Sequence, residues 1–195
     1  MSKGLKLTDI LITIVIAVVF ALIYRLWADV STVVRLAGLQ LDELVYGVWF
    51  MAATVAFLLI RKPGVALLAE VAAASGELVA GSQYGVEAIT YGIGQGLGAE
   101  LVFLLLRYRS FSAAAACLAG LASAAASLMF DWYKGSLFAL QPWNLSLLVV
   151  FRLIGGIFFT GLCACWLVKA LEATGVTQLV RPANQADYDA LERPQ

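Results

Sequence analysis

Six long apolar runs, separated by short polar breaks, constrain the fold of this chain more than any other feature of its sequence. About 20 apolar residues in a helix cross the ~30 Å hydrocarbon core of a bilayer. Each run approaches or reaches that length, so we predict an all-α membrane protein that is a bundle of six transmembrane helices. The runs cover residues 7–27, 43–60, 63–81, 86–106, 111–130 and 146–170.

The six runs divide the chain into a transmembrane substrate-binding domain over residues 1–173 and a short polar tail over residues 174–195. Hydrophobic residues make up 62% of the sequence and charged residues only 13%, whereas soluble domains are about 25% charged. The net charge of zero argues against nucleic acid as a partner, and the lipid bilayer is the partner that the composition indicates.

The sequence contains no histidine, which is the usual general base and a common transition-metal ligand. Its three cysteines all lie within apolar runs, where small packing side chains are expected. We therefore expect no metal site, no cofactor and no enzymatic activity. The three cysteines are Cys117, Cys163 and Cys165.

The distribution of lysine and arginine predicts the orientation in the membrane, because cytoplasmic loops are enriched in these residues. If the N-terminus is inside, the outer side holds only Arg35 and Lys134, with Arg25 at the end of the first run. We therefore predict that both termini are cytoplasmic. The inner side then holds Lys3, Lys6, Arg61, Lys62, Arg107, Arg109, Lys169, Arg181 and Arg193.

Three glutamates, Glu70, Glu77 and Glu100, lie inside the apolar runs. A charge at the centre of the bilayer costs about 2.5–3.5 kcal/mol even on lenient scales, so such residues usually serve a function. Glu70 and Glu77 are seven residues apart, nearly two helical turns, and so share one face. The runs offer few basic partners, which indicates a pocket that accepts a cation from water.

Carboxylates and aromatic side chains gather in the outer half of the predicted bundle, a combination that suits a flat organic cation. A desolvated cation over an aromatic face gains about 2 kcal/mol, and a neighbouring carboxylate accepts hydrogen bonds from ring amines. The candidate ligand-binding residues are Tyr46, Trp49, Glu70, Glu77, Tyr84, Gln95, Asp131, Trp132, Tyr133, Trp143 and Asn144.

Several of these residues also fit structural roles. Tryptophan and tyrosine at helix ends often form an interfacial belt. Glu77 could pair with Arg152 in the outer half of the sixth run, and Glu100 could be structural or serve a partner interface. Gln95 lies among alternate glycines that allow close helix packing.

Four segments together resemble the YkoE family, the substrate-binding S components of energy-coupling factor (ECF) transporters for thiamine or its hydroxymethylpyrimidine precursor. The resemblance is densest over residues 46–109 and extends more loosely to about Gly175. The segments are Tyr46-Gly47-Val48-Trp49-Phe50, Arg61-Lys62-Pro63-Gly64, the pair Glu70 and Glu77, and Gly94-Gln95-Gly96-Leu97-Gly98-Ala99-Glu100.

The resemblance implies six helices in a bacterial cell membrane, a binding site in the outer half, and three partners: a transmembrane coupling subunit and two ABC ATPase subunits. It also implies that an Ala-x-x-x-Ala patch on the first helix, here Ala17 and Ala21, packs on the coupling subunit. The chain itself has no GxxxxGK[ST] phosphate-binding loop, so another subunit must supply energy for uphill transport.

For thiamine, the resemblance implies that aromatic side chains stack on the rings, with Trp49, Trp132, Tyr133 or Trp143 as candidates. Glu77 or Gln95 would bond the aminopyrimidine, and Asp131 or Glu70 would balance the thiazolium charge. An S component for the hydroxymethylpyrimidine precursor is the alternative. Two remoter alternatives are an intramembrane enzyme that uses Glu70 and Glu100 as acid and base, and an assembly subunit without a ligand.

Overall fold

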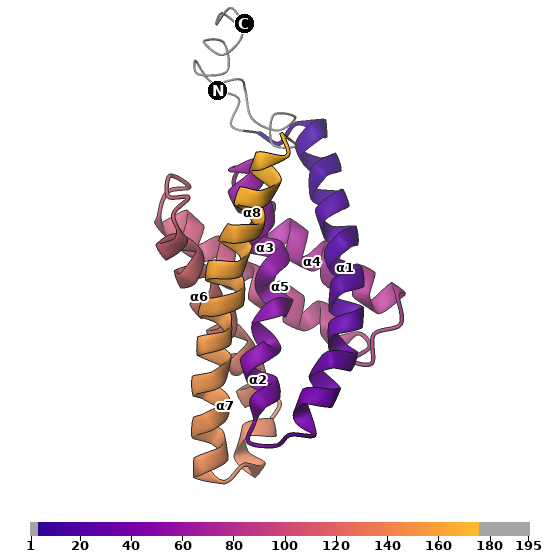
Figure 1. Ribbon diagram of the computed structural model, residues 1–195, viewed down its shortest axis with the longest axis vertical. Helices are drawn as coiled ribbons and strands as arrows, with labels where there is room; N and C mark the ends of the chain where they lie inside the picture. Colours follow the sequence, from indigo (N-terminus) through magenta and orange to yellow (C-terminus); the bar gives the residue numbers. More distant parts are fainter. Residues whose placement is uncertain (1–3, 176–195) are drawn as a thin grey trace, which may run out of the picture.

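The computed structural model describes residues 4–175, and within them the chain crosses the bundle six times (Figure 1). The first crossing is α1, the third α4, the fourth α5 and the fifth α6, while the second and the sixth are each built from three consecutive helical segments. The bounds are α1 Leu7–Arg35, α2 Leu41–Val45, η1 Tyr46–Phe50, α3 Met51–Ile60, α4 Val65–Val79, α5 Glu87–Leu105, α6 Ala113–Tyr133, η2 Ser136–Ala139, α7 Pro142–Gly155, η3 Gly156–Cys163 and α8 Ala164–Ala173.

Five of the six crossings are long and apolar enough to span a membrane, and α4 is the exception. With 15 residues, α4 is about 22 Å long, shorter than the ~30 Å hydrocarbon core. It packs between α1, α3 and α5, so its alanine-rich and glycine-rich sequence is used for close contact inside the bundle. The all-α prediction with six helices is therefore confirmed, whereas one helix is shorter than expected.

Glu100 of α5 stabilises the N-terminal end of α4, where the first backbone N–H groups lack partners within the helix. Its carboxylate accepts hydrogen bonds from the backbone N–H groups of Gly64 at 2.6 Å and Leu67 at 3.2 Å, and from the Tyr108 hydroxyl at 2.9 Å. Burial and this hydrogen bond raise the pKa of Tyr108 to about 12, so its hydroxyl remains a donor at neutral pH. Of the two alternatives for Glu100, a structural role and a partner interface, the structure shows the structural one: it stabilises the start of α4.

The second crossing is interrupted by η1, a 3₁₀ segment, and the sixth by η3, a π-helical segment. The two irregular segments contact each other, and the Thr160 hydroxyl of η3 donates a hydrogen bond to the Gly47 carbonyl oxygen at 2.9 Å. Glycines allow this approach, because a Cβ atom on Gly47 would collide with the backbone of Gly155. Helix periodicity predicts neither interruption, since both sequences are as apolar as a regular helix.

Two helix boundaries differ from the prediction by four residues or more. The first helix continues past residue 27 to Arg35, because no glycine or proline occurs between residue 27 and Gly38, where φ is +77°. The sixth crossing begins at Pro142, a residue suited to the first turn of a helix, so Trp143 and Asn144 lie in that turn rather than before it.

The predicted partner-interface residues on the first helix, Ala17 and Ala21, are buried inside the bundle, with 3% and 5% of their surface exposed. Ala21 faces α4, and a Cβ atom added to Gly76 of α4 would lie 2.6 Å from the Ala21 Cβ atom. In this structure the small residues bring α1 close to α4 and leave no free patch. The prediction that they form an exposed contact for a coupling subunit is therefore corrected.

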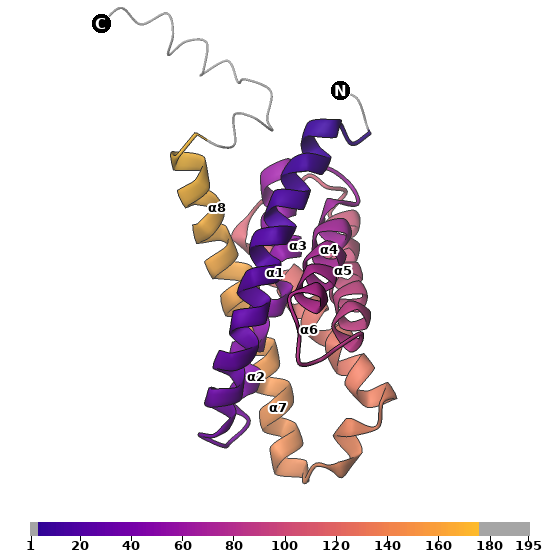
Figure 2. The ribbon, with the colours of Figure 1, turned by 90° about the vertical axis from the view of Figure 1, so that its right-hand side faces the viewer.

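The start of α1 and the end of α8 lie at one end of the molecule, and α2 and α7 lie together at the opposite end (Figures 1 and 2). Six crossings bring the chain back to the side where it began. Of the predicted polar tail, all but Thr174 and Gly175 falls outside the described residues.

We predict that Gly98→Ala destabilises the protein by about 1–3 kcal/mol, because a Cβ atom there would lie 2.7 Å from the Ala122 carbonyl oxygen and force α5 away from α6. Thermal unfolding in detergent measures the effect. Leu101→Ala, on the half-exposed face of the same helix, is the control and should unfold close to the wild type. Equal melting temperatures for Gly98→Ala and the wild type would contradict the packing described here.

Candidate ligand-binding cavity

A cavity of about 650 Å³ opens at the end of the bundle formed by α2, the end of α1 and the start of α7. Its volume falls in the range of small-molecule sites, about 300–1,000 Å³. Side chains from every crossing line it, so the cavity belongs to the bundle as a whole. The lining residues are Tyr24, Ser31, Arg35, Gly38, Leu39, Gln40, Asp42, Glu43, Tyr46, Trp49, Glu70, Ala74, Glu77, Tyr84, Glu87, Ala88, Tyr91, Gln95, Asp131, Lys134, Ser136, Leu137, Leu140, Leu148 and Arg152.

Glu70 is fully buried and holds the first turn of α3, which begins inside the bundle because of the interruption at η1. One carboxylate oxygen accepts the Ala53 backbone N–H at 2.9 Å, and the other accepts the Tyr24 hydroxyl at 2.9 Å. The Tyr24 oxygen in turn accepts the Ala52 N–H at 3.0 Å. Two N–H groups without partners in the helix are thereby satisfied, which is a physical reason for an acidic residue at this depth.

Glu77, two turns further along α4, is 1% exposed and lies beside the aromatic side chains of the cavity. Its carboxylate accepts the Ser82 hydroxyl at 2.9 Å and has the Trp49 side chain as a second hydrogen-bond neighbour. The Trp49 ring meets Tyr84 edge-on at 6.0 Å between centroids. Arg25 is paired with Asp29 on the surface of α1 and forms no ion pair with Glu77, so it interacts with Glu77 only by longer-range electrostatic attraction.

Gln95 of α5 is 3% exposed, yet its side-chain amide makes no hydrogen bond to any residue that the structure describes. Only its backbone carbonyl is engaged, by the Ser123 hydroxyl at 2.8 Å. Because Gln95 lines the cavity, its amide offers one acceptor and two donors to whatever occupies this space. Since no described residue occupies these groups, the amide is available to hydrogen-bond a ligand in the cavity.

Arg152 of α7 joins three crossings through a buried ion-pair network. Its Nε atom donates to the Glu43 carboxylate of α2 at 2.6 Å, and its Nη1 atom donates to Asp131 of α6. The guanidinium carbon lies 4.2 Å from the centre of the Tyr46 ring. The Tyr91 hydroxyl donates to the second oxygen of Asp131, so both oxygens of that carboxylate are engaged.

Two further ion pairs lie at the rim of the cavity. Arg35 at the end of α1 donates to Asp42 at 2.8 Å, and Lys134 after α6 pairs with Glu87 at the start of α5. The Lys134–Glu87 pair is exposed, with 39% and 58% of the two side chains accessible. Exposed pairs of this kind contribute about 0–1 kcal/mol to stability, so they define the charge of the rim more than its rigidity.

Charge in the cavity is unbalanced. Six carboxylates and three basic side chains line it, and all three bases are held in ion pairs. Within residues 4–175, Glu70 and Glu77 form no ion pair. Of the three carboxyl groups in excess, one belongs to the pair that shares Arg152, and the other two lie in the deep part of the cavity, beside Trp49 and Gln95.

Seven of the eleven sequence-predicted ligand residues line this cavity, and four do not. Trp132, Tyr133 and Trp143 are 61%, 85% and 69% exposed, and Asn144 is half-buried in the first turn of α7. Their helix ends face outward at this level, as expected of an interfacial aromatic belt. The seven that line the cavity are Tyr46, Trp49, Glu70, Glu77, Tyr84, Gln95 and Asp131.

Sequence reasoning missed Glu43, the main partner of Arg152. Glu43 is the first residue of a predicted span, where a charged side chain is expected to lie at the membrane interface. The alternative that Glu77 pairs with Arg152 is wrong, since Arg152 binds Glu43 and Asp131 instead. An intramembrane arginine needs carboxylates at its own depth, and that requirement could have directed attention to the start of the second crossing and the end of the fifth.

Comparison with known proteins agrees with this architecture. Residues 8–126 match the family model described as ABC-type cobalt transport system, permease component. The chain is 38% identical over 175 residues to "Putative HMP/thiamine permease protein YkoE" of Bacillus subtilis (strain 168), covering 89% of this chain and 88% of that protein. It also superposes on the crystal structure of an S component of an ECF transporter with a TM-score of 0.86 and 38% identity, covering 90% and 89% of the two chains.

The six-crossing bundle with a polar cavity at one end thus defines a multi-pass membrane protein of the ECF S-component class, which works with an ECF module and is not an enzyme. Within that class, the chain belongs to the YkoE-like family of HMP/thiamine permeases. The resemblance seen in residues 46–109 is confirmed.

We predict that Arg152→Gln destabilises the protein by about 3–5 kcal/mol, because it leaves Glu43 and Asp131 buried without their counter-charge. Lys134→Gln removes a basic side chain from the same cavity but from an exposed pair, and should cost less than about 1 kcal/mol. Thermal unfolding of the two variants side by side gives the comparison. Similar losses in both would contradict the assignment of Arg152 as the structural link between crossings.

Proposed function

We propose that this chain captures thiamine in an outward-facing cavity and delivers it through an ECF module made of a transmembrane coupling subunit and two ABC ATPase subunits. The observation that carries the proposal is the deep part of the cavity, which is acidic, partly aromatic and without a compensating base. There, the carboxyl groups of Glu70 and Glu77 form no ion pair with the described residues, and the Gln95 amide makes no hydrogen bond to them. The Trp49 and Tyr84 rings form an aromatic wall beside Glu77.

The carboxylates support a cationic ligand. Thiamine carries a permanent thiazolium charge, and Glu77 forms no ion pair with the described residues that would compete for it. The Trp49 and Tyr84 rings beside Glu77 offer aromatic faces and edges to a flat cation. Asp131, by contrast, has both oxygens engaged by Arg152 and Tyr91, and both oxygens of Glu70 accept hydrogen bonds from Ala53 and Tyr24, so the charge-balancing role falls to Glu77.

The amide of Gln95 supports an aminopyrimidine. Such a ring presents an amino donor next to a ring-nitrogen acceptor, and a primary amide presents the complementary acceptor and donor. Gln95 and Glu77 line one cavity from neighbouring helices, α5 and α4, so a two-ring ligand can reach both. A site built to hydrogen-bond a ring amine discriminates strongly against analogues that lack it.

Hydroxymethylpyrimidine is the second candidate, because the Gln95 amide serves the pyrimidine ring alone. This ligand has no permanent cation and would leave the Glu77 carboxylate without a counter-charge. We therefore rank it below thiamine.

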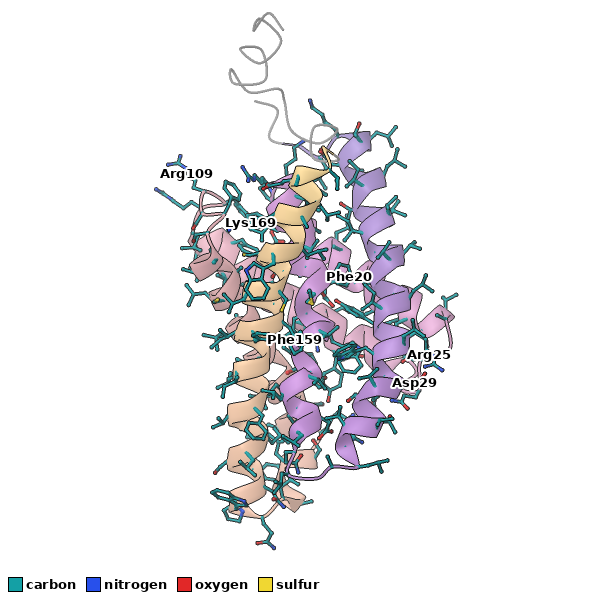
Figure 3. All side chains as sticks on the ribbon, in the orientation of Figure 1. Phe20, Arg25, Asp29, Arg109, Phe159 and Lys169 are labelled. Carbon is teal, nitrogen blue, oxygen red and sulfur yellow. The ribbon has the colours of Figure 1, made fainter. Side chains whose placement is uncertain are left out.

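The proposed orientation places both termini in the cytoplasm. Arg109 and Lys169 lie toward the end of the molecule where α1 starts and α8 ends (Figure 3). The cavity is at the opposite end, with Arg35, α2 and the start of α7. Cytoplasmic loops are enriched in basic residues, so the cavity faces outward.

We predict that Glu77→Gln weakens thiamine binding at least about tenfold, because the amide loses the charge that faces the thiazolium. Hydroxymethylpyrimidine binding should fall less, since it carries no permanent charge. Calorimetric titration of the purified variant measures both affinities. Glu100→Gln, an intramembrane glutamate outside the cavity, is the matched control and should bind thiamine as the wild type does. Unchanged thiamine affinity in Glu77→Gln would remove this residue from the site.

The orientation is tested by cysteine labelling in a variant whose three native cysteines are replaced by alanine. A cysteine at Ser136, on the cavity rim, should react with a membrane-impermeant maleimide in intact cells. A cysteine at Arg109 should react only after the cells are permeabilised. The reverse pattern would place the cavity on the cytoplasmic side.

A further inference from the structure

Each basic side chain that lines the cavity is already bonded to a carboxylate of this chain. Arg35 is held by Asp42, Lys134 by Glu87, and Arg152 by two partners. The cavity therefore contains three basic side chains, and the charge of each is compensated by a carboxylate. A negatively charged ligand thus finds no free base to bind in this cavity.

Arg152 is the most enclosed of the three. Its side chain is 4% exposed, and the carboxylates of Glu43 and Asp131 approach it from α2 and α6. The Ser127 hydroxyl lies 3.4 Å from Nη1, and the Tyr46 ring packs against the guanidinium plane. An arginine with a free planar fork is the side chain best suited to bind a phosphate, and here the carboxylates occupy it.

We propose that Glu43 and Asp131 are specificity-determining residues, which hold Arg152 so that the cavity selects the unphosphorylated form of its ligand over the phosphate monoester. The inference rests on the proposed function, because it concerns the same cavity and the same ligand class. It assigns the acidic partners of Arg152 a role in rejection, in addition to their role in linking three crossings.

The physical argument is one of charge. A phosphate monoester brings about −1.5 to −2 charges at neutral pH. In this cavity six acidic side chains outnumber three bases, and four of those acids hold all three bases in ion pairs, so no base is left to bind the phosphate. Rejection by juxtaposed like charges is a common source of specificity, and removing the rejecting charge relaxes it.

The experiment measures affinity for two matched pairs by calorimetry on the purified chain: thiamine with thiamine monophosphate, and hydroxymethylpyrimidine with its phosphate ester. The selectivity ratio is the affinity for the unphosphorylated form divided by that for the ester. We expect a ratio well above ten in the wild type. Glu43→Gln, which releases part of the Arg152 charge, should lower that ratio about tenfold.

Two further variants guard against a folding defect in Glu43→Gln. Glu87→Gln releases Lys134 at the exposed rim, where the change is tolerated, and should also lower the ratio, by a smaller factor. Glu172→Gln removes a carboxylate paired with Arg61 near the end of α8, which lies at the end of the molecule opposite α2 (Figure 1), and should leave the ratio unchanged.

A wild-type ratio near one, or a ratio that neither Glu43→Gln nor Glu87→Gln lowers, would overturn the inference. If thiamine fails to bind while the pyrimidine pair binds with a high ratio that the variants lower, the proposed substrate falls and the charge selection stands. If thiamine binds with a ratio near one, the proposed substrate stands and the charge selection falls. If neither pair binds, both proposals fall.

Discussion

The hydrogen bonds that Glu70 accepts within the bundle are the interaction on which the cavity depends. A helix that begins inside a membrane protein exposes N–H groups that neither lipid nor neighbouring helix backbones can satisfy. Glu70 and Tyr24 supply acceptors to Ala53 and Ala52, so the second crossing can be interrupted at η1. That interruption places Tyr46 and Trp49 at the cavity, where a continuous helix would present different side chains.

The other acidic side chains within the bundle also have identifiable roles. Glu100 caps α4, and Glu43 and Asp131 compensate Arg152. Glu77 combines deep burial with an aromatic neighbourhood and accepts hydrogen bonds from neutral groups. Ion pairs thus join the walls of the cavity, whereas the deep Glu77 carboxylate has no basic partner among the described residues. This arrangement suits a receptor for an organic cation.

Much of this was predictable from the sequence, and the exceptions have physical causes. The six crossings followed from apolar length, and the shared face of Glu70 and Glu77 followed from helical periodicity, because both depend only on local spacing. The interruptions at η1 and η3 depend on glycine contacts between distant segments such as Gly47 and Gly155, which spacing alone does not reveal. Trp132 and Trp143 were misplaced for a related reason: aromatic residues at helix ends serve cavities and lipid interfaces alike, and only the tertiary fold separates the two uses.

The central claim is that this cavity binds thiamine, and calorimetric titration of the purified, ligand-free chain with thiamine beside hydroxymethylpyrimidine tests it most directly. The account predicts saturable binding of thiamine at one site, tighter than that of the pyrimidine, because only thiamine carries the cation that the deep carboxylates lack. Failure of thiamine to bind a chain shown to be folded, or a clear preference for the uncharged pyrimidine, would contradict it.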